Sequence, residues 1–106
     1  MNNTRIELLK QYIIEEPNEP FNIYALANEY ITEEPQTALK YFEQLLAHYP
    51  EYLGTYYQAG KLFAAFGQVN NAKAIFESGI SLALKQTNLK TMNELKGALN
   101  ELLDEE

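Results

Sequence analysis

The sequence contains no cysteine, no tryptophan and only 1 histidine among its 106 residues. Without cysteine, a disulfide framework and a thiolate metal site are both excluded, and one histidine cannot supply a cluster of imidazole ligands. No apolar run reaches the roughly 18 residues of a membrane-spanning helix, and the N-terminus lacks the apolar core of a secretory signal. We therefore expect a cytoplasmic protein with no membrane span, no metal and no other cofactor.

Basic side chains are also few. The chain has 8 lysine and arginine residues against 15 acids, which gives a net charge of −7. Nucleic acid and anionic membranes bind clustered basic side chains, so neither is an expected partner. The charge is uneven, because residues 1–51 carry nine acids and three bases, residues 52–96 two acids and five bases, and residues 97–106 four acids and no base. Only the middle segment is net positive.

Motifs for catalysis are absent as well. His48 stands at an expected helix end, where a lone histidine is most often a surface residue. The phosphate-binding patterns GxGxxG and GxxxxGK followed by serine or threonine do not occur. The glutamate pairs at 15–16 and 33–34 border prolines in loops, where solvated charge explains them better than an acid–base pair. We predict that the protein is not an enzyme.

Apolar residues recur at three- and four-residue spacing along the chain, which is the pattern of amphipathic helices. The hydrophobic share is 46%, and no stretch alternates in period two long enough to form a strand. We therefore expect a single all-helical domain with short loops. The expected segments are an N-terminal helix at 4–16, one helix pair at 20–50, a second pair at 53–85 and a C-terminal helix at 88–104, all within the domain 1–106.

Two of these segments have recognisable ends and faces. Thr4 is the expected N-cap of the first helix, with Glu7 completing a capping box. Gly67 is the expected C-terminal glycine of the fourth helix. The last helix is expected to bury an apolar stripe made of Leu89, Met92, Leu95, Leu99 and Leu102.

The two helix pairs repeat each other. The stretch IYALANEY at 23–30 aligns with YYQAGKLF at 56–63, a separation of 33 residues, and the helices that follow align at 34 residues. A glycine inside a helix costs up to about 1 kcal/mol relative to alanine, so Gly60 implies a close helix–helix contact that offsets the cost. The expected packing positions are Leu26, Ala27, Tyr30, Ala38, Phe42 and Pro50 in repeat 1 and Tyr56, Ala59, Gly60, Phe63, Ala72 and Phe76 in repeat 2.

These positions resemble the tetratricopeptide repeat (TPR), a helix–turn–helix unit of 34 residues with the pattern W-x2-L-G-x2-Y, then A-x3-F, then P. The second repeat departs from this pattern at Gly79, where alanine is usual, and at Leu84, where proline is expected. The flanking helices look similar to those of short bacterial TPR proteins of unassigned role. The resemblance implies a right-handed solenoid of about six antiparallel helices, with residues 4–16 covering one end and residues 88–104 capping the other.

The resemblance also implies a function. In the TPR family the first helix of each pair lines a concave face that holds a peptide or a helix of a partner protein. We therefore expect an interaction module or adaptor with a protein partner; the alternative is a homodimer assembled through the same apolar surface. By position, the groove residues are Phe21, Tyr24, Asn28 and Ile31 in repeat 1 and Tyr57, Gln58, Lys61 and Ala65 in repeat 2.

Two features of this expected groove have alternative explanations. The tyrosines at equivalent places, Tyr24 and Tyr57, either pack against a neighbouring helix or form an aromatic contact surface for the partner. Asn28 and Lys61 are expected to receive a carboxylate, as in family members that grip a C-terminal acid. The fuller clamp of those members needs basic residues from a third repeat, which this chain lacks.

Overall fold

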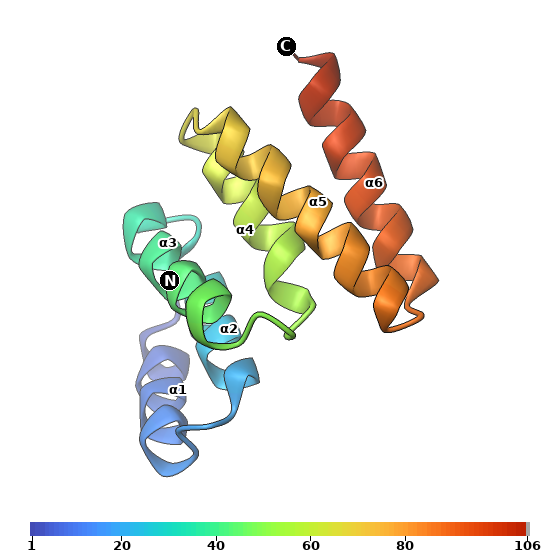
Figure 1. Ribbon diagram of the computed structural model, residues 1–106. Coiled ribbons are helices and arrows are strands. Elements are labelled where there is room, and N and C mark those ends of the chain that lie inside the picture. The colour runs from blue at the N-terminus through green and yellow to red at the C-terminus, as the bar shows by residue number, and fades with distance from the viewer. Residues whose placement is uncertain (106) are drawn as a thin grey trace. The chain divides into compact units, whose positions relative to one another are not determined.

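A computed structural model describes residues 1–105 of the chain (Figure 1). All regular secondary structure in this part of the chain is helical. This finding confirms the all-α fold with six helices that the apolar spacing predicted. The helices are α1 (Asn3–Glu15), α2 (Pro20–Tyr30), α3 (Pro35–His48), α4 (Gly54–Ala65), α5 (Val69–Lys85) and α6 (Leu89–Asp104).

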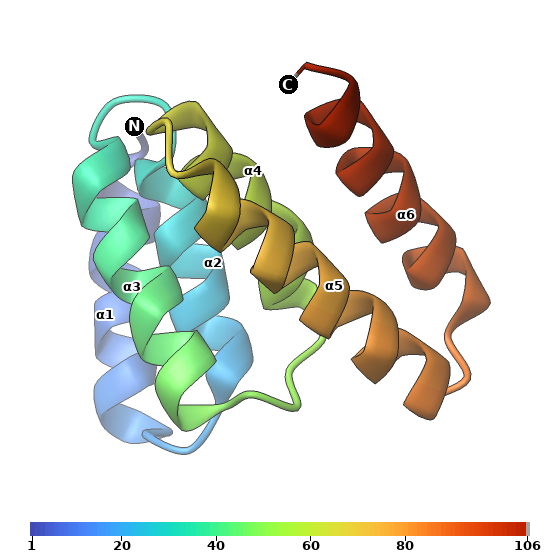
Figure 2. The same ribbon diagram turned by 45° about the horizontal axis from the view of Figure 1, so that its top comes forward.

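The helices form two compact units, Met1–Tyr52 with α1 to α3 and Leu53–Glu106 with α4 to α6. In the N-terminal unit, α2 packs against both α1 and α3. In the C-terminal unit, α5 packs against both α4 and α6 (Figure 2). The α4 helix also contacts α6. Each unit therefore holds one of the expected helix pairs and one additional helix. The arrangement as a single domain over residues 1–106 stays a prediction.

The start of α1 differs from the prediction. Asn2 is the N-cap, with extended backbone angles, and its side-chain oxygen accepts a hydrogen bond of 3.0 Å from the backbone N–H of Arg5. Thr4, the predicted cap, lies inside the first turn instead. The prediction was wrong because asparagine caps a helix at least as well as threonine, and Asn2 stands earlier in the chain.

Two turns each contain a residue in the left-handed backbone conformation. Gly67, between α4 and α5, has a φ of +79°, and its N–H donates to Ala64 while the next N–H donates to Phe63. This geometry confirms Gly67 as the C-terminal glycine. The same pattern of hydrogen bonds recurs between α5 and α6 around Thr87, whose φ is +54°. No sequence signal indicated Thr87, because a β-branched residue is rare in that conformation.

The α1 helix is attached to α2 by apolar and ionic contacts within the N-terminal unit. Ile6 and Leu9 are its buried residues. The Arg5 Nε atom lies 2.7 Å from a carboxylate oxygen of Glu29 on α2. Leu8, which belongs to the same helix, remains exposed. The first helix, which was expected to cover one end of the helical stack, therefore buries only a narrow apolar stripe, formed by Ile6 and Leu9.

The two repeats bury aligned residues. Of the twelve expected packing positions, all but Pro50 are buried. In the N-terminal unit, Ala27 and Phe42 are completely inaccessible to solvent. Their counterparts in the C-terminal unit are Gly60 and Phe76. The same pairing of a small residue with a phenylalanine therefore lies in the core of each unit.

Gly60 lies against the ring of Phe76. A methyl group at Gly60 would lie 2.3 Å from the ring carbon Cε1 of Phe76, well inside van der Waals contact. The Phe76 side chain is only 2% exposed, so its ring is packed on nearly all sides. Glycine is therefore required at this crossing of α4 and α5, which explains why a helix interior contains it.

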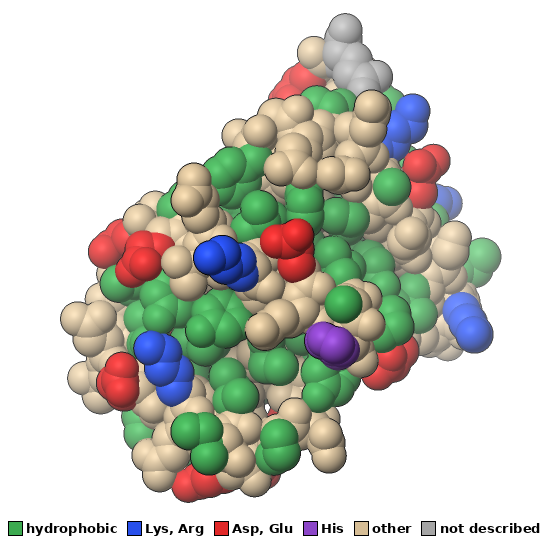
Figure 3. All heavy atoms as spheres, turned by 60° about the vertical axis from the view of Figure 1, so that its left-hand side comes forward, with side chains coloured by type: hydrophobic (Ala, Val, Ile, Leu, Met, Phe, Trp, Pro, Cys, Tyr) green, Lys and Arg blue, Asp and Glu red, His purple; other side chains and the backbone are tan. Residues whose placement is uncertain are grey.

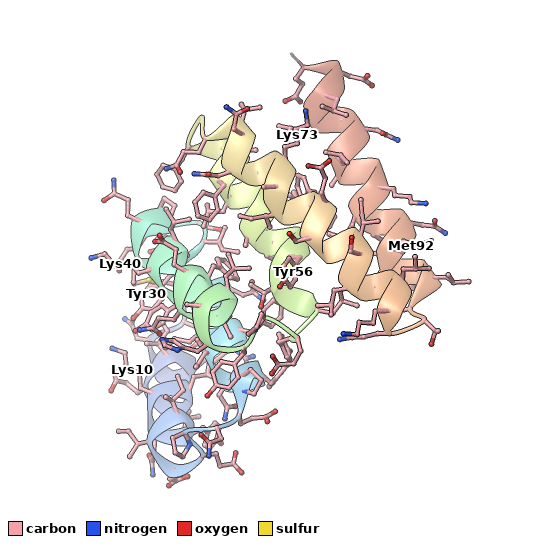
Figure 4. All side chains as sticks on the ribbon, in the orientation of Figure 1. Lys10, Tyr30, Lys40, Tyr56, Lys73 and Met92 are labelled. Atoms are coloured by element: carbon pink, nitrogen blue, oxygen red, sulfur yellow. The ribbon has the colours of Figure 1, made fainter. Side chains whose placement is uncertain are left out.

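A second glycine, Gly79, makes a contact of the same kind one helical turn after Phe76 on α5. A methyl group at Gly79 would lie 2.7 Å from Cβ of Tyr56 on α4 and 3.0 Å from Cδ1 of Leu95 on α6. Figure 4 shows Tyr56 on α4, beside α5. Gly79 thus lets α5 approach both of its neighbours, and this contact explains the departure from the usual alanine.

The apolar stripe of α6 is shorter than predicted. Leu95 and Leu102 are buried, and Met92 and Leu99 are half-buried. Leu89, by contrast, is 58% exposed, so its assignment to the buried stripe was wrong. Leu89 is the first residue of α6, directly after the loop. Apolar spacing predicts buried positions least well at a helix end, because the end itself is uncertain by one or two residues.

We expect Gly60→Ala to lower the free energy of unfolding by about 1–3 kcal/mol, because the added methyl group overpacks the contact with Phe76. Gly97→Ala on α6 is the matched control, since a methyl group there meets no atom within 4 Å. The control should gain up to about 1 kcal/mol from helix propensity. Denaturant unfolding followed by circular dichroism measures both. Equal gains in the two variants would contradict the close contact.

We expect Leu95→Ala to cost about 2–5 kcal/mol, because Leu95 is completely buried against α5 and its truncation leaves a cavity. The same substitution at the exposed Leu89 should change stability by less than about 0.5 kcal/mol. The same unfolding experiment compares the two. If the two variants lose equal stability, α6 is not anchored through Leu95.

Candidate functional site

Within the part of the chain that the structure describes, no group of three or more histidine, cysteine, aspartate or glutamate side chains is placed to hold a metal ion. His48, the last residue of α3, is exposed, and Figure 3 shows its side chain at the surface. None of the described helices combines the length and the apolar character needed to cross a membrane.

The expected groove residues of repeat 1 lie along one face of α2. Phe21 is the most exposed of them, at 49%, whereas Tyr24, Asn28 and Ile31 are half-buried. The Tyr24 ring packs edge-on against Phe42, at 6.4 Å between ring centroids. Of the two explanations for Tyr24, packing within its own unit is therefore the one that the contacts show.

Tyr24 also belongs to an aromatic cluster at the end of the N-terminal unit. Its ring lies 5.6 Å from that of Tyr52, measured between centroids. Burial raises the pKa of Tyr52 above its ordinary value, and Tyr24 and Glu19 add smaller effects in the same direction. The Tyr52 phenol is therefore neutral at physiological pH and packs against Tyr24 as an uncharged ring.

The side-chain amide of Asn28 lies in an unusual environment. Its side-chain oxygen is buried and has no hydrogen-bond partner among the described residues. A buried acceptor without a partner costs stability, because it has lost its water and gained nothing in exchange. Asn28 lies one helical turn beyond Tyr24 on the same face of α2. An N–H group from a bound partner would satisfy this oxygen.

The expected groove residues of repeat 2 lead to a pocket in the C-terminal unit. Tyr57, Lys61 and Ala65 follow one another at four-residue spacing on α4, and all three line a cavity of about 260 Å³. Gln58, the fourth expected residue, is half-buried and does not line it. We call this cavity the α4–α6 pocket. Its walls are Tyr57, Lys61, Ala64 and Ala65 from α4, Phe76 from α5, and Ala98, Glu101, Leu102 and Glu105 from α6 and its C-cap.

Charged groups stand on two walls of the α4–α6 pocket. On the α4 wall, the Lys61 ammonium lies over the Tyr57 ring, 5.0 Å from its centroid, which is cation–π geometry. On the α6 wall stand Glu101 and Glu105. With one cation and two carboxylates, the lining has a net negative charge.

The α6 wall was missed by sequence reasoning. Residues 88–104 were assigned only a capping role, since the expected groove used the first helix of each complete repeat. One face of α6 carries the residues that lie three, four and seven positions after Ala98, which are Glu101, Leu102 and Glu105. This second face of α6, beside its buried stripe, was the signal that could have found the pocket.

The structure brings the repeat 2 residues together with α6 in one unit, and it places the four repeat 1 residues on α2 in the other unit. Each set is described within its own unit. A continuous groove that joins the two sets stays a prediction.

Comparison with known proteins gives matches among solved structures, whereas no protein-family model and no curated protein matches the chain. A tetratricopeptide repeat domain protein from Salinibacter ruber, solved in solution, is 34% identical; the match covers 82% of this chain and 89% of that one, with a TM-score of 0.77. A crystal structure of a tetratricopeptide repeat domain protein from the same organism also gives 34% identity, with 83% and 100% coverage and a TM-score of 0.79.

A protein from Bordetella parapertussis shares the fold at lower identity. It is 23% identical, the match covers 94% of this chain and 88% of that one, and the TM-score is 0.79. The helix pairs built on glycine and alanine contacts define a helical repeat protein. The match to the Salinibacter proteins over most of both chains shows that this chain belongs to the tetratricopeptide repeat family. Domains of this family generally serve as protein–protein interaction modules.

We expect Asn28→Leu to raise the free energy of unfolding by about 1 kcal/mol more than Asn100→Leu, because only the first substitution removes a buried acceptor without a partner. Asn100 is exposed on α6, so its substitution measures the gain in helix propensity alone. Parallel denaturant titrations give the difference. A loss of stability in Asn28→Leu would show that the amide is hydrogen-bonded in the folded protein.

Proposed function

We propose that this chain is a non-enzymatic adaptor, in which the exposed faces of α2 and α4 bind a peptide or a helix of a partner protein. The α4–α6 pocket is the observation that carries this proposal, because Tyr57, Lys61 and Ala65 were expected at a binding surface from their positions in the repeat and all three line it. An aromatic ring with a polar group beside a lysine is typical of protein interfaces.

The size of the pocket favours a protein partner over a small molecule. Small-molecule sites commonly measure about 300–1,000 Å³ and enclose most of their ligand. The α4–α6 pocket, at about 260 Å³, lies below this range. A hollow of this size accommodates a side chain or two of a segment that lies across it.

The α2 face supports the same function. Phe21 presents an exposed aromatic ring near the start of α2, and Asn28 has a buried oxygen without a partner among the described residues on the same face. An apolar contact and an unsatisfied acceptor are what an extended segment with backbone N–H groups would use. The α2 face therefore offers contacts of its own to such a segment.

Self-association is the second candidate, and exposed apolar side chains favour it. Phe21 on α2 and Leu8 and Ile14 on α1 are all exposed. Light scattering over a concentration series separates the two candidates. An adaptor gives the mass of one chain throughout, whereas a dimer that persists on dilution and dissociates on Phe21→Glu would replace the adaptor with an assembly protein.

We expect Ala65→Trp to reduce the recovery of partner proteins from native cell extract about tenfold or more, because the indole fills the α4–α6 pocket. Ala74→Trp is the matched control: Ala74 is also an exposed helical alanine but lies outside the pocket lining. Quantitative mass spectrometry of affinity-purified material compares wild type and both variants. Recovery of the same proteins in the same amounts by both variants would exclude the pocket as the binding determinant.

A further inference from the structure

We propose that the α4–α6 pocket receives a basic side chain of the partner, and arginine in particular. This inference rests on the proposed function and specifies the chemistry of the partner. It differs from the expectation that Asn28 and Lys61 receive a carboxylate, which followed from family resemblance alone. The argument depends on the charges, the helix ends and the apolar floor of the pocket.

The carboxylates of the pocket are the first reason. Glu101 and Glu105 both line it, and neither forms an ion pair with another described residue. Lys61 lies over the Tyr57 ring instead of pairing with them. Two carboxylates without an internal cation attract an external one, and they repel a bound acid at the same place.

The helix ends add to this negative potential. Ala64 and Ala65 are the last two residues of α4, and Glu101 and Glu105 belong to the last turn and the C-cap of α6. A helix C-terminus carries a partial negative charge of roughly half an elementary charge, since its last carbonyl groups lack helical partners. The α5 contribution, Phe76, lies about two turns after the start of that helix at Val69, so the positive end of α5 does not line the pocket.

The floor of the pocket fits the rest of an arginine side chain. Ala64, Ala98, Phe76 and Leu102 supply apolar surface. Arginine buries its aliphatic stem on such surface while its guanidinium reaches polar groups at the rim. A guanidinium can also bind one carboxylate through two parallel hydrogen bonds, which the ammonium of lysine cannot do. These features favour arginine over lysine.

The charge of the whole chain acts in the same direction. At −7, the protein attracts a basic segment at long range and repels an acidic one. The last ten residues alone carry four acids and no base. Most of this charge belongs to residues 1–52 and acts on the approach of a partner, whereas near the pocket the acids gather at the end of α6 that carries Glu101 and Glu105.

A peptide-display selection tests the proposal on the full chain, with a random dodecapeptide library as the probe. We expect wild type to enrich peptides that contain arginine beside an apolar residue, about tenfold over their frequency in the library. Glu101→Lys/Glu105→Lys should abolish that enrichment. Glu77→Lys/Glu94→Lys should retain it, because these two glutamates are also exposed, on α5 and α6, but do not line the pocket.

A third variant tests whether the pocket binds arginine or a carboxylate. Lys61→Gln removes the one cation of the pocket, so binding of a selected arginine peptide, measured by fluorescence anisotropy, should tighten. If the pocket binds a carboxylate at Lys61, the same substitution weakens binding. Circular dichroism spectra that match wild type verify the fold of each variant.

The outcomes distinguish this inference from the proposed function. Selection of acidic peptides, or of arginine peptides whose binding is unchanged by Glu101→Lys/Glu105→Lys, overturns the basic partner and leaves a binding pocket. If wild type selects no peptides, or only peptides that the Ala65→Trp variant also selects, both the pocket and the proposed function are overturned.

Discussion

The close approach of helices at glycine is the constraint on which the C-terminal unit depends. Gly60 meets the ring of Phe76, and Gly79 meets Tyr56 and Leu95, at distances where no other residue has room for its Cβ atom. The α5 helix therefore contacts α4 and α6 along its two sides, with large side chains filling the space beside each glycine. The pocket between α4 and α6 exists because α5 holds both helices, and Phe76 contributes to its wall.

The fold was largely predictable from the sequence because its signals are local and repeated. The spacing of apolar residues predicted six helices, and the aligned Ala27 and Gly60 positions indicated where a helix pair crosses. Gly79 showed only as a departure from the family pattern, since its role depends on contacts with two other helices at once. Asn2 and Thr87 were missed because the choice between neighbouring caps, or of an unusual backbone angle, is decided by geometry that spacing does not encode.

The candidate site was predictable only in part, for a related reason. The α4 residues of the pocket followed from their positions in the repeat. The α6 residues did not, because a helix assigned to cover an apolar face was given no second role. The charge of the expected ligand shows the same limit. Asn28 and Lys61 suggested that the groove binds a carboxylate, whereas the opposite charge is suggested only when Glu101 and Glu105 are seen to line the same pocket as Lys61. The sequence therefore indicates the pocket residues of a single helix, but it does not indicate which residues of another helix lie opposite them.

Leu102 and Phe76 are both core residues of the C-terminal unit and part of the pocket lining. An occupant of the pocket consequently touches the same side chains that hold α6 in place. Binding and folding are then thermodynamically linked, because a ligand that binds only the docked form of α6 shifts the equilibrium toward that form. The partner would act as an additional piece of the hydrophobic core, and the last helix of the chain would report its presence by resisting local unfolding.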